Sequence, residues 1–222
     1  MVTIEKLTHI LRDNINNFKT VSKSNMTSIE SLKYLFNTSI TDWSKYKNIL
    51  NDELQYNKNI NLEKTINDGY IDGNNSYYNN FSLKKIEGDR NSWYYRMKLP
   101  YAKDTDIFSL YLIKWLPFSK SYIHNHEDMG CLFKILDGEI EEKIFDSDNF
   151  TIQDVNEYSN ITLFHNNKNK IGYIDDNIGL HSIHNNTNKD VYSLHLYAKR
   201  YSRELHKYSH HNFSLIKYFP FG

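Results

Sequence analysis

The chain has 222 residues, which is enough for one domain with a sizeable core. Its 27 basic residues balance its 27 acidic ones, so no net charge favours nucleic acid or an anionic membrane as a partner. No apolar run approaches the roughly 20 residues that a membrane-spanning helix needs, and the first residues lack the apolar core of a signal peptide. The single cysteine, Cys131, cannot form an internal disulfide, which fits a reducing compartment. We therefore expect a cytoplasmic protein that binds neither nucleic acid nor membrane.

Residues 1–90 are predicted to form a helical region that belongs to the same domain as the rest of the chain. Apolar residues within 4–11 recur at the spacing of one helix face. The sequence at 27–30 matches a capping box and predicts the start of a second helix. A third helix is expected over 41–50. Asn, Asp and Gly are frequent in 51–80, which indicates short elements separated by turns.

Residues 91–222 are predicted to form a β-barrel, because short β-favouring runs alternate there with turns. Asp137-Gly138 between two of these runs is typical of a hairpin. Many short strands at such spacing indicate a mainly β protein, either an antiparallel sandwich or a jelly-roll barrel. The predicted strands are 93–99, 108–115, 131–136, 139–145, 161–164, 171–174, 181–184 and 192–197.

His124 and His126 are the first candidates for a metal site, because two strand residues separated by a single residue face the same side. A third ligand must come from elsewhere in the barrel, and the chain offers His181. Three imidazoles would leave a divalent metal its full charge and open coordination positions. The alternative to a metal site is that His124 and His126 are surface histidines without a ligand. By strand parity we expect His184 to be exposed, and we assign surface or structural roles to the lone histidines His165, His206, His210 and His211.

The pair His124 and His126 followed by Gly138, and later His181 followed by Asn185, resemble the two motifs of cupins. This resemblance implies a cupin jelly-roll barrel with the helical region packed on it. In most cupins the position of Cys131 is a glutamate ligand, so the thiol is a departure.

A more specific resemblance covers roughly residues 90–200, where five segments are similar, in order and spacing, to those of cysteine dioxygenases. The segments are 94–96, 115–131, 138–146, 173–181 and 193–197. The resemblance implies that His124, His126 and His181 ligate one Fe(II) per chain. It also implies that Arg96 pairs with the substrate carboxylate through its planar guanidinium, with Tyr94 beside it.

The same resemblance assigns the remaining pocket residues. Tyr197 would lie over the open face of the iron, and Cys131 and Tyr197 would form a thioether crosslink. Ser193 and His195 share strand parity with Tyr197, so we expect them to hydrogen-bond its hydroxyl. Trp115 would close the pocket wall. Tyr197, His195 and Cys131 are therefore the predicted catalytic residues.

The implied activity is oxidation of L-cysteine to cysteine sulfinic acid by addition of both atoms of O2, in a monomeric enzyme. A dioxygenase for another small thiol, such as 3-mercaptopropionate or cysteamine, stays open, although Arg96 weighs against cysteamine. A metal-binding cupin without turnover also stays open, because the segment after Tyr197 departs from the family pattern. A third alternative treats residues 1–90 as an interaction module.

Overall fold

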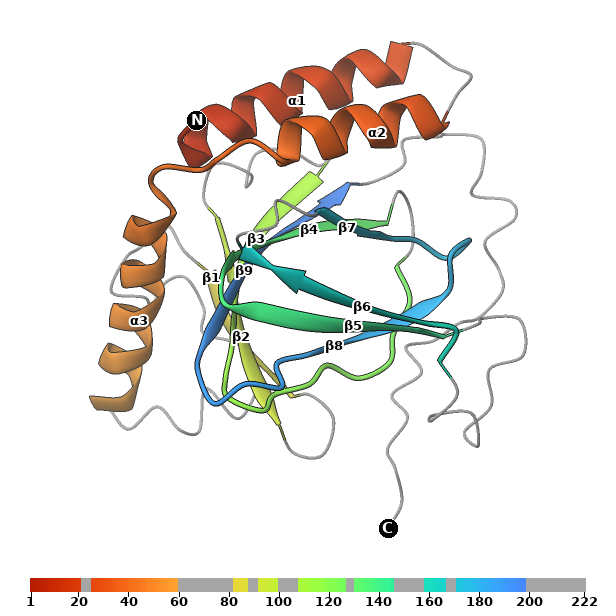
Figure 1. Cartoon of the computed structure of the whole chain (residues 1–222). Helices are drawn as coiled ribbons and strands as arrows, with labels where there is room; N and C mark the ends of the chain where they lie inside the picture. Colours follow the sequence, from red (N-terminus) through yellow and green to blue (C-terminus); the bar gives the residue numbers. More distant parts are fainter. Residues whose placement is uncertain are drawn as a thin grey trace.

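The computed structural model has three helices followed by nine strands within the part of the chain that it describes (Figure 1). The described residues are 1–20, 25–59, 82–87, 92–99, 108–126, 130–145, 158–166 and 171–198. The helices are α1 (Ile4–Thr20), α2 (Asn25–Phe36) and α3 (Trp43–Asn59). The strands are β1 (Ser82–Glu87), β2 (Trp93–Lys98), β3 (Phe108–Trp115), β4 (Cys131–Asp137), β5 (Glu139–Phe145), β6 (Asn160–His165), β7 (Ile171–Ile174), β8 (Leu180–His184) and β9 (Val191–Ala198).

The strands form two antiparallel sheets. The larger sheet has the order β1-β2-β3-β9-β4-β7, and the smaller one has the order β6-β5-β8. Two isolated bridges, Lys120 with His184 and His124 with His181, connect the segment after β3 to β8 of the smaller sheet. The segment that carries the paired histidines is therefore fastened to the strand that carries the third one.

Alternation along the strands of the larger sheet separates two hydrophobic cores. On β3, Leu110 and Leu112 face the helices and belong to an outer core. Ile113 and Trp115 belong to an inner core that also contains Ile183 of the smaller sheet. The two sheets thus pack face to face with their inner side chains between them, which confirms the prediction of a mainly β jelly-roll.

The helices cover the outward face of the larger sheet, where α1 and α2 lie side by side (Figure 1). Ile4 begins α1, and its amide donates to the Asp42 carboxylate at 2.8 Å, so a residue just before α3 caps α1. Lys134 on β4 is buried and donates from Nζ to the carbonyls of Asn37 and Thr38, at 3.0 and 3.1 Å. A lysine at these carbonyls neutralises the partial negative charge at the end of α2. The helical region therefore packs on the larger sheet of the jelly-roll, as predicted.

The sequence-based boundaries need three corrections. The strand β1 was not predicted. The helix α3 continues to Asn59, although 51–59 was expected to consist of short elements. The helix α2 begins at Asn25, so Thr27 lies in its first turn and the predicted capping box does not start the helix. The division between 1–90 and 91–222 stays a prediction. No described helix has the length and apolarity to cross a membrane.

Candidate metal centre

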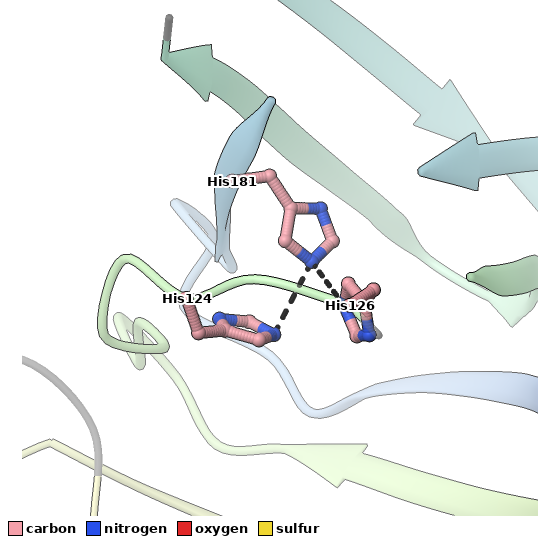
Figure 2. A group of neighbouring side chains, drawn as sticks. All are labelled: His124, His126 and His181. Atoms are coloured by element: carbon pink, nitrogen blue, oxygen red, sulfur yellow. Dashed lines mark hydrogen bonds between the residues drawn. The ribbon is translucent and has the colours of Figure 1, made fainter. Parts of the chain in front are cut away.

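The three predicted histidines come together from two segments (Figure 2). The backbones of His124 and His181 exchange two hydrogen bonds, of 3.0 and 2.9 Å. One ligand nitrogen from each of His124, His126 and His181 lies within 4.8 Å of the others. The segment around His124 is a loop with a single β-bridge instead of the expected strand, yet both of its histidines turn toward His181.

The outer ring nitrogens of two of these histidines are held by acceptors. The Nδ1 atom of His124 lies 2.8 Å from the Tyr122 carbonyl, and a carbonyl only accepts, so this nitrogen carries the proton. The Nδ1 atom of His181 lies 2.7 Å from a carboxylate oxygen of Glu142 and likewise donates. Both histidines therefore present an unprotonated Nε2 to the centre of the group.

The Nε2 atoms of the three histidines lie close together. The Nε2 atom of His181 lies 3.2 Å from that of His124 and 2.8 Å from that of His126. Metal–imidazole bonds of about 2.1 Å that meet at right angles would place two nitrogens roughly 3.0 Å apart. The spacing and the donor atoms of His124, His126 and His181 therefore fit one divalent transition metal.

Electrostatics keeps these rings neutral, as metal ligands must be. Desolvation lowers the pKa of His124, and the positive charge of Arg96 lowers it further, against the hydrogen bond to Tyr122. Burial lowers the pKa of His126 and of His181 well below the usual 6.5, and the neighbouring histidines lower both further. Proton competition for the ligand nitrogens is therefore weak near neutral pH.

Glu142 has a role that sequence reasoning missed. Its carboxylate and the His181 ring are both almost fully buried, and a carboxylate oxygen lies 2.7 Å from Nδ1 of the ring. Such a carboxylate fixes the tautomer and the ring orientation of a ligand histidine. The available signal was an acidic residue at an inward position of β5, two residues after the buried Ile140.

Asp176 also supports the site from outside. Its carboxylate accepts a hydrogen bond from the His126 backbone amide at 2.9 Å and so ties the ligand loop to the turn before β8. That turn ends at Gly179, whose φ of 140° suits glycine. A Cβ atom there would lie 2.3 Å from the Phe145 carbonyl oxygen, so only glycine lets β8 begin where it does.

Arg96 and Tyr94 lie on β2, on the inner side of the larger sheet near the histidines. The Arg96 charge lowers the pKa of several site groups, including His124, Cys131 and His195. Among the described residues no carboxylate forms an ion pair with Arg96, and its guanidinium carbon lies 4.6 Å from the centre of the Tyr111 ring. Tyr94 stacks on Trp115 with ring centres 4.5 Å apart, and burial raises its pKa to about 12.

Cys131 and Tyr197 face each other across the β4–β9 ladder as direct partners. Burial raises the pKa of the Cys131 thiol, against the lowering effect of the neighbouring Tyr197 hydroxyl. Burial and the neighbouring Cys131 also raise the pKa of Tyr197. Both groups therefore hold their protons at neutral pH. The Tyr197 ring packs 5.5 Å from the His126 ring, at the edge of the metal centre.

The predicted bond from His195 to the Tyr197 hydroxyl is not the one that the structure describes. The Trp115 indole donates to the Ser193 hydroxyl at 2.8 Å, and this hydroxyl then donates to Nε2 of His195 at 2.8 Å. The remaining N–H of neutral His195, at Nδ1, faces the Cys131 sulfur at 3.6 Å. The rings of His195 and Tyr197 are stacked at 6.2 Å, because they stand two residues apart on one strand face. Burial, together with Arg96, lowers the pKa of His195 to about 3.

Phe133 fixes the tilt of the His195 ring from the other side. The two rings are stacked with centres 5.4 Å apart and planes 16° apart. The same Phe133 ring covers Gly172 on β7, where a Cβ atom would lie 2.2 Å from ring carbons. The orientation of His195 thus depends on the absence of a side chain on the neighbouring strand.

His184 is half-buried and bonded to Ser182 at 2.7 Å, so the prediction that it is exposed is wrong. His165 is half-buried at the end of β6, whereas His206, His210 and His211 lie outside the described residues. Asn185 is buried, and its amide donates to the carbonyls of Trp115, Leu116 and Lys189, which fixes the end of β3.

Comparison with known proteins defines the class to which this fold and site belong. The sequence model of cysteine dioxygenase type I matches residues 83–211. Cysteine dioxygenase type 1 of Rattus norvegicus is 35% identical over 92 residues, which cover 41% of this chain and 44% of that protein. The Danio rerio protein of the same name is 32% identical over 92 residues, which cover 41% and 45%. The aligned segment thus spans less than half the length of these relatives.

Among solved structures, the cupin domain of Schizosaccharomyces pombe Cnp3 aligns with a TM-score of 0.35 at 15% identity. This alignment covers 48% of the chain and 64% of that domain. Because the family model matches more than half of the residues, the chain belongs to the cysteine dioxygenase type I family.

Proposed function

We propose that this protein is an iron(II)-dependent thiol dioxygenase that converts L-cysteine and O2 to cysteine sulfinic acid. The observation that carries the proposal is one arrangement: a cluster of three neutral imidazoles beside a guanidinium that no described carboxylate pairs with. Such a site suits a ligand that brings an anionic sulfur to the metal and a carboxylate to the cation.

Binding divides between two ends of the site. His124, His126 and His181 would hold Fe(II), and Arg96 would bind the substrate carboxylate, with Tyr94 beside it. A charged pair to a planar guanidinium is directional, so it would orient the substrate as well as hold it. Bound Fe(II) would supply the redox chemistry that joins both oxygen atoms to the substrate sulfur.

The groups around Tyr197 would control protons. The raised pKa of Tyr197 keeps its hydroxyl protonated, so it can donate a hydrogen bond toward anionic ligands at the metal centre. The Trp115–Ser193–His195 series holds a proton at Nδ1 of His195, pointing at the Cys131 sulfur. Cys131 and Tyr197 are direct partners on adjacent strands, which supports the proposed thioether between them. Mass spectrometry would report this crosslink as a loss of two hydrogens.

An oxygen electrode tests the reaction. The protein loaded with Fe(II) is given L-cysteine, 3-mercaptopropionate or cysteamine, and the sulfinate product is identified by mass spectrometry. We expect oxygen uptake with the carboxylated thiols, fastest with L-cysteine, and little with cysteamine. If the iron-loaded protein consumes no oxygen with any thiol, the proposed activity is wrong and a metal-binding cupin without turnover remains.

We further propose that the protein acts as a monomer in the cytoplasm. Light scattering on the purified chain and imaging of a tagged copy would test these two points.

A further inference from the structure

Arg96, Tyr111 and Tyr197 occupy diagonal positions on three adjacent strands. Arg96 pairs with Ile113 across β2 and β3, and Tyr197 pairs with Ser109 across β9 and β3. Tyr111 is therefore two residues from the direct partner of each, at a diagonal that long and aromatic side chains can reach. The three side chains form one row on the inner face of the larger sheet.

The contacts in this row are made through the Tyr111 ring. The Arg96 guanidinium carbon lies 4.6 Å from the centre of that ring, which is a cation–π contact. The edge of the ring meets Tyr197 at 5.6 Å with planes 81° apart. Within the described part of the chain the Tyr111 hydroxyl has no hydrogen-bond partner. The ring, and not the hydroxyl, is therefore the part that acts on Arg96.

A cation–π contact restrains a guanidinium without using its N–H groups. The N–H donors of Arg96 lie in the guanidinium plane and form its bidentate bonds to a carboxylate. Because the Tyr111 ring takes none of these donors, it can restrain Arg96 while leaving them for a ligand. An arginine side chain otherwise loses considerable rotamer entropy when a ligand fixes it, so a restrained Arg96 binds more tightly.

The Tyr111 ring also relates the two ends of the site. Through Tyr197, which packs on His126 at 5.5 Å, the ring is in contact with the side chains around the metal centre. One aromatic side chain thus sets the position of the cation relative to the three histidines. That distance decides which thiol carboxylates can reach both ends at once.

We propose that Tyr111 is a positioning residue that holds Arg96 for the carboxylate of the substrate and thereby selects carboxylated thiols. The inference rests on the proposed function, since it takes Arg96 to be the carboxylate anchor. Nothing in the sequence pattern marked Tyr111, which stands on β3 among alternating core residues.

Anaerobic titration calorimetry tests the inference on the full chain loaded with Fe(II), with L-cysteine and cysteamine as probes. Tyr111→Leu removes the ring, and Tyr111→Phe keeps it. Tyr95→Leu is the matched control, because Tyr95 is a half-buried tyrosine that packs against the outer core. We expect Tyr111→Leu to weaken L-cysteine binding roughly 3- to 30-fold, the size of a partly desolvated cation–π contact. Cysteamine binding should change little, and Tyr111→Phe should restore L-cysteine binding to within about twofold of wild type.

A double-mutant cycle shows whether Tyr111 acts through Arg96. In an Arg96→Ala background, Tyr111→Leu should cause no further loss of L-cysteine affinity. Equal losses for L-cysteine and cysteamine, additive losses in the cycle, or an unchanged L-cysteine affinity in Tyr111→Leu would each overturn the inference. If wild type binds L-cysteine without consuming oxygen, only the proposed reaction fails. If wild type does not bind L-cysteine, both proposals fail.

Discussion

The two faces of β9 show how differently the two sides of the larger sheet are built. Tyr192, Leu194 and Leu196 point to the helices and lie in an apolar core. Ser193 and His195, between them in the sequence, point to the space between the sheets and are equally buried. On the second face, the described side chains form hydrogen bonds with other buried polar groups. The first face is stabilised mainly by hydrophobic packing.

This difference separates the sources of stability from the sources of function. The outer core has few groups that need a particular partner, so a substitution there alters the free energy of unfolding. The space between the two sheets contains histidines, a carboxylate and a guanidinium, which are costly to bury without polar or charged partners. Substitutions there should alter metal and ligand binding more than folding.

The largest expected effect is loss of the metal by His181→Ala. The change removes one of three ligand nitrogens, so iron affinity should fall by more than the roughly 10- to 100-fold that loss of an outer hydrogen bond costs. Iron content after gel filtration and oxygen uptake with L-cysteine measure this. His184→Ala, three residues along the same strand, is the control and should keep its iron. Full iron content in His181→Ala would mean that the metal is bound elsewhere.

The outer face should respond in the opposite way. Leu194→Ala opens a cavity at a fully buried position, so the free energy of unfolding should fall by about 2–5 kcal/mol. Urea titration measures this change, and Leu163→Ala, at a position 50% exposed, should stay within roughly 0.5 kcal/mol of wild type. The folded variant should still bind one iron per chain. Loss of iron from fully folded Leu194→Ala would show that the two faces are coupled.

Glu142→Gln should weaken the metal site without removing a ligand. The neutral amide no longer fixes the His181 tautomer with a negative charge. By analogy with other histidine–carboxylate pairs at metal sites, we expect a loss of iron affinity of about 10- to 100-fold. Competition with a chelator of known affinity measures it. Glu141→Gln alters the adjacent carboxylate, which contacts Lys143 at 3.6 Å, and should leave the affinity unchanged. Equal affinities for the two variants would exclude this role for Glu142.

The smallest effect is a change in the pH dependence of stability. The pKa of His195 is lowered from 6.5 to about 3 in the folded protein, so the unfolded chain binds a proton there first as the pH falls. The contribution of His195 to the free energy of unfolding is therefore fully retained above pH 6.5, and it is lost as the pH falls from 6.5 toward 3. His195→Gln should reduce this slope by up to about 1.4 kcal/mol per pH unit. Urea titrations of chelator-treated protein test it, with the exposed His9→Gln as control, and an unchanged slope in His195→Gln would contradict the prediction.

The sequence predicted what depends on local spacing. The β-favouring residues of 192–197 identified β9, and the His124, His126 and His181 set was found from motifs. The roles of Glu142 and Tyr111 were not predicted, because strand register decides which residues they contact. His181 lies 39 positions from Glu142, and Arg96 contacts Tyr111 only through the pairing of β2 with β3. The hydrogen bond between Ser193 and His195 was not predicted for a related reason, since it depends on the Trp115 indole, which is 78 positions from Ser193.

Gly172 gives a way to adjust the interior from the margin of the sheet. It stands on β7, the last strand of the larger sheet, and the Phe133 ring that covers it is the surface on which His195 rests. Gly172→Ala would push on that ring, and the displacement would pass to the imidazole. Protein engineers could therefore use this glycine as a remote adjustment for His195, while every side chain that faces the metal keeps its identity.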